Sequence, residues 1–170
     1  MASINLYLIR HGIAAERGTY ADDAERPLTQ VGRQKTQEVA AQLQRLDLSF
    51  DLILTSPYVR ACQTAEILEA AGLSNQVEVS RLLAPAGDIQ SWLPWLERSR
   101  LSGKTHLALV GHEPDLGNWA EILIYREIKG RLRLKKAGII GLTLPETGSP
   151  IGQSYLFWLT PPRLLLGALD

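Results

Sequence analysis

Along the chain, short hydrophobic runs alternate with longer segments in which apolar residues recur every three to four positions. The short runs are typical of buried strands, and the periodic segments are typical of amphipathic helices. The predicted strands cover residues 4–9, 52–55, 77–79, 105–110, 138–144 and 155–160. The predicted helices cover residues 30–46, 57–71, 88–97 and 114–125, with a short one after Pro161-Pro162. Strands separated by helices indicate a mostly parallel central sheet covered on both faces, which predicts a three-layer α/β/α fold.

Single residues mark several boundaries of these elements. Thr29 is suited to cap the helix that begins near Gln30, and Ser56-Pro57 opens the next helix. Gly72 ends that second helix, and Pro94 lies inside the third helix or near its start. The buried face of the first helix is expected to carry Val31, Val39, Ala40, Leu43 and Leu46.

Composition narrows the class of protein. The 170 residues fit one domain, so we expect residues 1–170 to form a single unit. Lysine plus arginine and aspartate plus glutamate each number 18, and this balance argues against nucleic acid or a membrane surface as the partner. The single cysteine, Cys62, excludes an internal disulfide and suits a reducing compartment. Since no run reaches the roughly 18 apolar residues of a membrane span, and the N-terminal residues lack the features of a signal peptide, we expect a cytoplasmic protein.

Chemically active side chains follow three of the predicted strands. In open α/β sheets, ligands bind beyond the carboxyl ends of the strands. The first strand ends at Arg10-His11-Gly12, and the second is followed by Ser56 and, one helical turn later, Arg60. The third ends at Gly111-His112. Each residue alone suits a turn, a helix start or a solvated surface, but together they place two histidines and two arginines at one crevice.

Such a cluster is suited to phosphoryl transfer. A neutral imidazole attacks phosphorus, arginines hold the phosphoryl oxygens, and a second histidine donates to them, so that neither metal nor cofactor is needed. Other chemistries lack their motifs, because the chain has no Walker loop and no dinucleotide fingerprint. His112-Glu113 begins like a zincin helix but no second histidine follows, and Cys62 has no arginine six residues later. His106, inside a strand, and the Trp92/Trp95 pair are expected to be structural.

The same residues resemble the motifs of the histidine phosphatase superfamily, which includes cofactor-dependent phosphoglycerate mutases. The resemblance rests on Arg10-His11-Gly12, on the segment 56–64 (Ser-Pro-Tyr-Val-Arg-Ala-Cys-Gln-Thr) and on Gly111-His112, in the same order over residues 4 to 125. It implies a phosphoglycerate mutase-like fold with His11 as the phosphorylated nucleophile. It also implies a phosphate pocket formed by Arg10, Gly12, Arg60 and His112.

Within the superfamily the chain looks most like the SixA-type phosphohistidine phosphatases. It is short, and it carries Arg26-Pro27-Leu28-Thr29 near the start of its first helix. The resemblance implies that Arg26 joins the phosphate pocket, although a surface arginine is an equal alternative. Larger members have a glutamate as general acid where this chain has Ala84.

The residue at position 84 bears on the substrate. An alkoxide leaving group needs a strong acid, whereas imidazole, with a pKa near 6.5, leaves more readily. We therefore expect hydrolysis of phosphohistidine, on a histidine phosphotransfer domain in phosphorelay signalling. Glu113 or Asp88 remains a possible proton donor, which keeps a small-molecule phosphomonoesterase open and, less favoured, a sugar-phosphate mutase.

Two further alternatives concern binding. An inactive module that binds phosphohistidine and regulates a partner is the alternative to an enzyme, although the chain retains every expected pocket residue. The second concerns a basic run before the predicted strand at 138–144. This run is either a solvated edge or a docking surface for an acidic phosphotransfer domain. The run consists of Arg131, Arg133, Lys135 and Lys136.

Overall fold

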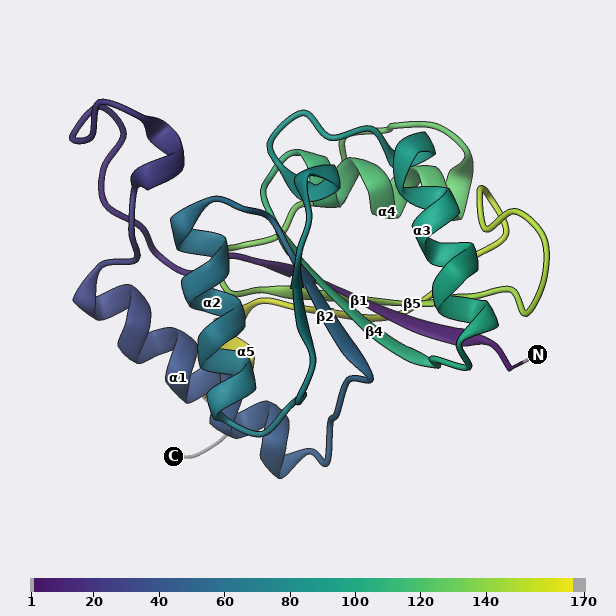
Figure 1. Ribbon diagram of the computed structural model, residues 1–170, viewed down its shortest axis with the longest axis horizontal. Helices are drawn as coiled ribbons and strands as arrows, with labels where there is room; N and C mark the ends of the chain where they lie inside the picture. The colour runs from purple at the N-terminus through teal and green to yellow at the C-terminus, as the bar shows by residue number, and fades with distance from the viewer. Residues whose placement is uncertain (1, 167–170) are drawn as a thin grey trace.

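A computed structural model describes residues 2–166 and contains a six-stranded sheet in the order β3-β2-β4-β1-β5-β6 (Figure 1). The strands are β1 Ile4–Arg10, β2 Leu52–Thr55, β3 Val77–Val79, β4 His106–Gly111, β5 Ile139–Leu144 and β6 Tyr155–Thr160. Strands β1 to β4 are mutually parallel, and β5 and β6 add an antiparallel edge next to β1. The prediction of a mostly parallel sheet is confirmed, because the four parallel strands are those that alternate with helices.

Helices cover both faces of this sheet (Figure 1). They are α1 Gln30–Arg45, α2 Val59–Ala70, α3 Ile89–Leu101, α4 Asp115–Tyr125 and α5 Pro162–Leu166, with short 3-10 turns at Asp23–Glu25 and Arg81–Leu83. Helices α1, α2 and α5 share one hydrophobic core with the sheet, and α3 and α4 share the other. The three-layer arrangement is therefore as predicted. Of the helices within residues 2–166, none is long and apolar enough to cross a membrane.

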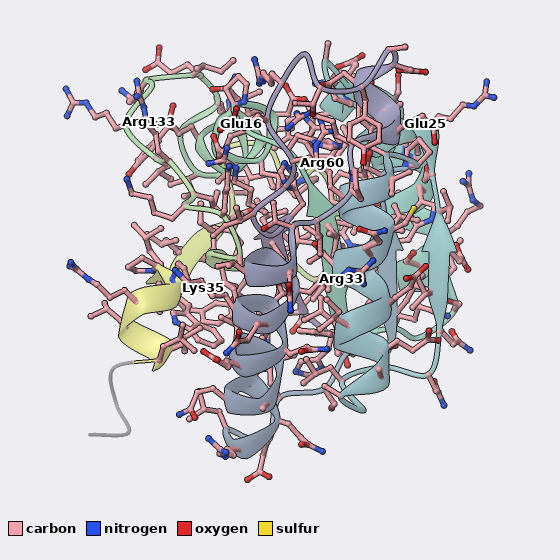
Figure 2. All side chains as sticks on the ribbon, turned by 90° about the vertical axis from the view of Figure 1, so that its left-hand side faces the viewer. Glu16, Glu25, Arg33, Lys35, Arg60 and Arg133 are labelled. Carbon is pink, nitrogen blue, oxygen red and sulfur yellow. The ribbon has the colours of Figure 1, made fainter. Side chains whose placement is uncertain are left out.

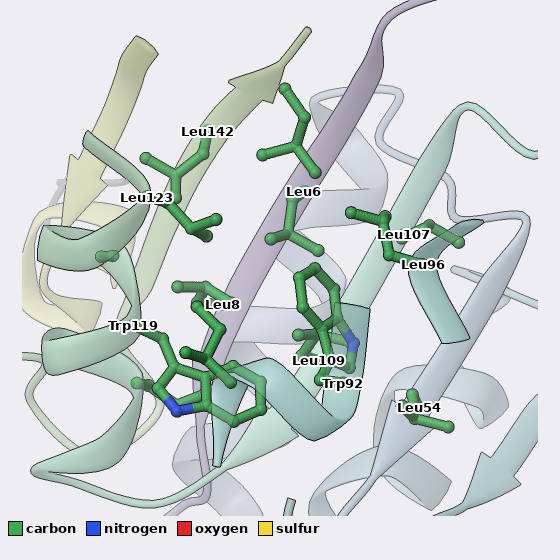
Figure 3. Close-up of a cluster of buried hydrophobic side chains, with 14 of the residues drawn as sticks. Leu6, Leu8, Leu54, Trp92, Leu96, Leu107, Leu109, Trp119, Leu123 and Leu142 are labelled. Carbon is green, nitrogen blue, oxygen red and sulfur yellow. The ribbon is translucent and has the colours of Figure 1, made fainter. Parts of the chain in front are cut away.

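The core between the sheet and helices α3 and α4 is built around tryptophan. Leu6 and Leu8 of β1 point toward this layer and meet Trp92 and Trp119 (Figure 3). The two indole rings lie 5.6 Å apart between centroids. Trp92 and Trp95 are both buried, so the prediction that this pair is structural is correct. Burying each large apolar side chain stabilises the folded state by roughly 1.5–3 kcal/mol. This packing holds the central strands, and therefore their ends, in place.

Helix α1 shows where the hydrophobic pattern was misleading. Val31 and Leu46 were expected on its buried face, but they are 54% and 52% exposed. The buried stripe instead runs through Gly32 and Thr36 before it reaches the apolar residues Val39, Ala40 and Leu43. Because a glycine and a threonine occupy the stripe in the first two turns, the apolar residues alone gave the wrong phase there.

Gly32 is in this stripe because the helix start lies directly against the backbone that follows His11 and Gly12. A Cβ at position 32 would lie 2.0 Å from the carbonyl oxygen of Ile13. Thr29 caps the helix by accepting a hydrogen bond from the Gly32 N–H at 2.9 Å, as the sequence predicted. The N-terminus of α1 is thereby fixed behind the end of β1.

We predict that Gly32→Ala destabilises the protein by about 1–3 kcal/mol, because the added methyl group meets a backbone carbonyl that is unable to move aside. Helix propensity alone predicts the opposite sign, since alanine is favoured over glycine by about 1 kcal/mol in a helix. Urea unfolding measures the difference. Gln34→Ala, on the exposed side of the same helix, serves as control and is expected to change stability by less than about 0.5 kcal/mol. A stabilising Gly32→Ala would contradict the close packing.

Candidate active site

The carboxyl ends of β1, β2 and β4 meet at one edge of the sheet. Arg10 pairs in register with Gly111, and Thr55 pairs with Val110. His11, Ser56 and His112 each follow directly. These ends open onto a cavity of about 410 Å³, which we call the catalytic cavity. Its wall includes five of the predicted residues, namely Arg10, His11, Arg26, Arg60 and His112.

The ring of His11 is buried and held in one orientation. Its Nδ1 lies 2.7 Å from the Gly12 carbonyl oxygen, which only accepts hydrogen bonds, so Nδ1 carries the proton and donates. The other ring nitrogen, Nε2, accepts a hydrogen bond from Arg60 Nε at 3.3 Å. Burial lowers the pKa of His11 to about 3; the hydrogen bond to Gly12 opposes this shift, and the charges of Arg60 and Arg10 add to it. The imidazole is therefore neutral near pH 7, with a lone pair on Nε2.

Gly12 itself does not line the catalytic cavity. Its N–H donates to Thr64 Oγ1 at 3.0 Å, and a Cβ at this position would lie 2.3 Å from Thr36 Oγ1. We expected Gly12 to bind phosphate, but its N–H is already bonded to Thr64. The residue has a structural role instead. Gly12 orients His11 through its carbonyl and lets helices α1 and α2 approach the turn.

Arg60 and Arg26 reach the cavity from different elements and are joined by one carboxylate. Arg60, in the first turn of α2, donates to the Asp23 carbonyl at 2.7 Å and to Asp23 Oδ2 at 2.9 Å. Arg26 donates from Nε to Asp23 Oδ1 at 2.7 Å and from its guanidinium to the Ala15 carbonyl at 2.6 Å. Hydrogen bonds from Arg26 and Arg60 lower the pKa of Asp23. Arg26 thus lies in the cavity wall, and the surface alternative is excluded because the side chain is buried.

His112 is also buried and lines the same cavity. Its Nε2 lies 2.7 Å from Ser56 Oγ, and its ring centroid is 5.2 Å from that of His11. Within residues 2–166, its Nδ1 has no hydrogen-bond partner. Burial lowers the pKa of His112 to about 4, with a further contribution from Arg60. Ser56, expected only to start a helix, also positions this second histidine.

Arg10 is fixed by the loop between α4 and β5. Its guanidinium donates to the Leu134 carbonyl at 2.9 Å, and the Leu134 N–H donates to Glu113 Oε1 at 3.0 Å. The same loop returns to the strand end where Ala137 N–H donates to the Arg10 carbonyl at 3.0 Å. Two cavity residues therefore depend on the position of Leu134.

A buried carboxylate, Glu121 of α4, holds this loop in place. It accepts the backbone N–H groups of Lys129, Gly130, Arg131 and Leu132, those of Gly130 and Leu132 at 2.7 Å. Burial raises the pKa of Glu121, but the four donors outweigh burial and bring the pKa to about 2. Sequence reasoning missed both Glu121 and Asp23. The signal for Glu121 is a charged residue between the apolar residues Ala120 and Leu123, whereas Asp23 gave none because it lies in a loop.

The two possible proton donors differ in position. Asp88 caps α3 by accepting the Gln90 N–H at 2.9 Å and does not line the catalytic cavity, so it is not placed to serve the reaction. Glu113 does line the cavity, and burial raises its pKa. Ala84 ends a 3-10 turn, and its neighbour Pro85 reaches the cavity wall.

The remaining candidates separate into structural and peripheral residues. His106 begins β4 at the far end of the strand, and Cys62 Sγ donates to the Ser56 carbonyl at 3.2 Å. Of the basic run, Lys136 lines the catalytic cavity, whereas Arg133 lies on the outer side of its loop (Figure 2). Within residues 2–166, no group of three or more His, Cys, Asp or Glu side chains is arranged to hold a metal ion.

Known proteins resemble this chain in sequence. A model of the histidine phosphatase superfamily (branch 1) matches residues 6–84. An uncharacterized protein of Picosynechococcus sp. is 49% identical over 167 residues, covering 96% of this chain and 99% of that protein. A phosphohistidine phosphatase SixA homolog of Haemophilus influenzae is 31% identical over 122 residues, covering 67% of this chain and 73% of that protein.

Solved structures extend the agreement to the fold. The protein histidine phosphatase SixA, complexed with tungstate, superposes with a TM-score of 0.83 at 27% identity, covering 95% of this chain and 99% of that one. Phosphoglycerate mutase from Bacillus anthracis shares the fold with a TM-score of 0.75 at 13% identity, covering 99% of this chain and 97% of that one. The chain belongs to the histidine phosphatase superfamily. Within that superfamily it is of the SixA type, a group of phosphatases.

We predict that the imidazoles of His11 and His112 stay neutral in the free protein as the pH falls from 8 to 5. Burial disfavours the imidazolium, so the pKa is about 3 for His11 and about 4 for His112, and each ring becomes protonated only near that pH. ¹⁵N NMR of the imidazole nitrogens measures the protonation state, with His11→Asn and His112→Asn used to assign the signals. A titration midpoint near 6.5 for either ring, the value of a solvated histidine, would contradict the burial of that ring.

Proposed function

We propose that this protein is a protein-phosphohistidine phosphatase that works through a covalent phospho-His11 intermediate. The observation that carries the proposal is the neutral His11 ring, whose Nδ1 proton is held by the Gly12 carbonyl while Nε2 faces the arginines. A lone pair on a fixed nitrogen, next to cations that neutralise a phosphoryl group, is the arrangement that phosphoryl transfer to histidine requires.

In the first step, His11 Nε2 forms a bond to phosphorus while the bond between phosphorus and the substrate nitrogen breaks. The substrate ring takes a proton from solvent on its other nitrogen, because imidazole titrates near 6.5, and leaves as a neutral imidazole. Arg60 gives up its hydrogen bond to Nε2 and turns its donors to the phosphoryl oxygens, where Arg10 and Arg26 join it. His112, whose ring centroid lies 5.2 Å from that of His11, donates a hydrogen bond to a phosphoryl oxygen. The charge that develops on the phosphoryl group is thus met by groups that already line the cavity, and only the donors of Arg60 change partners.

In the second step, water attacks the phosphorus of phospho-His11 and the bond to Nε2 breaks. The imidazole of His11 leaves with its Nδ1 proton still donated to Gly12, so the ring returns to its starting tautomer. The related SixA structure is a complex with tungstate, a tetrahedral oxyanion like phosphate, which supports an oxyanion site in this group of proteins.

The substrate follows from the leaving group. Position 84, where larger members carry a glutamate acid, is alanine, and an imidazole with a pKa near 6.5 leaves more easily than an alkoxide. We therefore favour a phosphohistidine on a protein, such as a histidine phosphotransfer domain of a cytoplasmic phosphorelay, as substrate. We propose that residues 1–170 act as one domain in this reaction.

A second candidate, a small-molecule phosphomonoesterase, is favoured by Glu113. Its carboxyl group lines the catalytic cavity and burial raises its pKa, which suits a proton donor to an alkoxide. The hydrogen bond that it accepts from Leu134 N–H favours instead a structural role. An inactive binding module is less favoured, because four of the five predicted phosphate-pocket residues, together with the His11 nucleophile, line one cavity.

Matched peptides that differ only in carrying phosphohistidine or phosphoserine test the proposal. We expect kcat/KM to be at least about 100-fold higher for phosphohistidine, since general acid catalysis is typically worth 10²–10⁴-fold to the ester and the P–N bond does not depend on it. Glu113→Gln should leave phosphohistidine turnover unchanged within about threefold, well below the size of such an acid effect. Asp88→Asn, which retains the helix cap, is the control. Equal or better turnover of phosphoserine, lost in Glu113→Gln, would establish the phosphomonoesterase instead.

A further inference from the structure

A second cavity adjoins the catalytic one, between the start of helix α1, the short helix α5 and the end of the basic run. It has a volume of about 730 Å³, and we call it the α1–α5 groove. Its apolar surface comes from Ile13, Ala137, Pro162 and Leu166. A volume of this size accommodates a few large side chains or a drug-sized molecule. It is an apolar recess that the mechanism of the preceding section does not use.

Every charged side chain that lines this groove within residues 2–166 is a cation. Lys35 comes from α1, Lys135 and Lys136 from the basic run, and Arg163 from α5. Figure 2 shows Lys35 on the side of α1 that faces the yellow helix α5, whereas Arg33 lies on the side that faces α2. Cations around an apolar recess, with no carboxylate among the wall residues that the structure describes, complement a ligand that is both acidic and apolar.

Lys136 lines both the α1–α5 groove and the catalytic cavity. The pKa of Lys136 is lowered by burial and then by the nearby cations Arg10, Arg26, Arg17 and Arg60. No acidic group is among the causes of that shift. This crowding of cations contrasts with the equal numbers of acidic and basic residues in the whole chain. All four arginines line the catalytic cavity, so the groove begins where that group of cations ends.

The α1–α5 groove and the catalytic cavity share two wall residues, Arg10 and Lys136. A chain attached to the phosphoryl group in the catalytic cavity therefore passes the groove within a few residues, since each residue of extended chain spans about 3.3–3.6 Å. A small phosphate ester lacks the chain that would fill it. The position of the groove thus distinguishes a protein substrate from a small molecule.

We propose that the α1–α5 groove binds an acidic, amphipathic segment of the substrate protein that lies beside its phosphohistidine. This inference rests on the proposed function. Apolar side chains of the segment occupy the recess formed by Ile13 and Leu166, and its carboxylates lie against Lys35, Lys135 and Arg163. The groove thereby selects among phosphohistidine proteins, while the catalytic cavity performs the same reaction on each of them.

Two phosphohistidine peptides test the proposal, one with alternating leucine and glutamate beside the phosphohistidine and the other with leucine and lysine. We expect the wild-type protein to show a kcat/KM about tenfold or more higher for the acidic peptide, a ratio that corresponds to about 1.4 kcal/mol. Lys35→Glu combined with Arg163→Glu should abolish or invert this preference. Arg33→Glu, on the opposite side of the same helix, should retain it. Phosphoramidate, a small donor with a P–N bond, should be hydrolysed equally by all three proteins.

Each outcome has a distinct meaning. Equal rates on the two peptides, or equal loss in Arg33→Glu and in the groove variant, would overturn the groove proposal while leaving the proposed function intact. Failure of the wild type to hydrolyse either peptide, with phosphoserine turned over normally, would instead overturn the proposed function and the groove proposal with it. A dimer in sedimentation experiments that the groove variant abolishes would assign the groove to a second copy of this chain and contradict a substrate site.

Discussion

At Gly12 the backbone leaves strand β1 through a space that has no room for a side chain, because a Cβ there would lie 2.3 Å from Thr36 Oγ1. Both polar groups of this residue are used: its N–H donates to Thr64 of α2, and its carbonyl accepts the Nδ1 proton of His11. Gly32 at the start of α1 lies against the next carbonyl, that of Ile13. One turn therefore joins a central strand and two helices, and the orientation of the proposed nucleophile follows from how closely they pack.

Electrostatics at this strand edge depend on burial and on two carboxylates. Burial keeps both imidazoles neutral beside four arginines of the cavity wall, so that cations outnumber carboxylates there without positive histidines. Asp23 joins Arg60 to Arg26, and Glu121 holds the loop that in turn holds Arg10. The arginines are thus oriented before any phosphate arrives, which lowers the reorganisation that phosphoryl transfer requires.

The sequence was sufficient for the strands, the helices and the convergence of His11, Arg60 and His112, because strand ends and motif spacing are local features. It was not sufficient where packing decides. Val31 was placed inside because apolar residues alone do not show that Gly32 takes the buried position. Gly12 was assigned to phosphate because its bond to Thr64, 52 residues away, is invisible in the sequence. Asp23 was missed because it lies in a loop, where no periodic pattern marks it. Glu121 was missed because it binds main-chain groups, which leave no trace in the sequence.

The central claim is that the phosphoryl group is transferred to Nε2 of His11. Rapid mixing with phosphoramidate, alkaline quenching within milliseconds and mass spectrometry of the peptides locate the phosphoryl group, and ³¹P NMR distinguishes the two ring nitrogens. We predict a transient adduct on His11 at Nε2, since Nδ1 donates its proton to the Gly12 carbonyl at 2.7 Å. An adduct on His112, an adduct on His11 Nδ1, or steady turnover without any phosphoenzyme would contradict it.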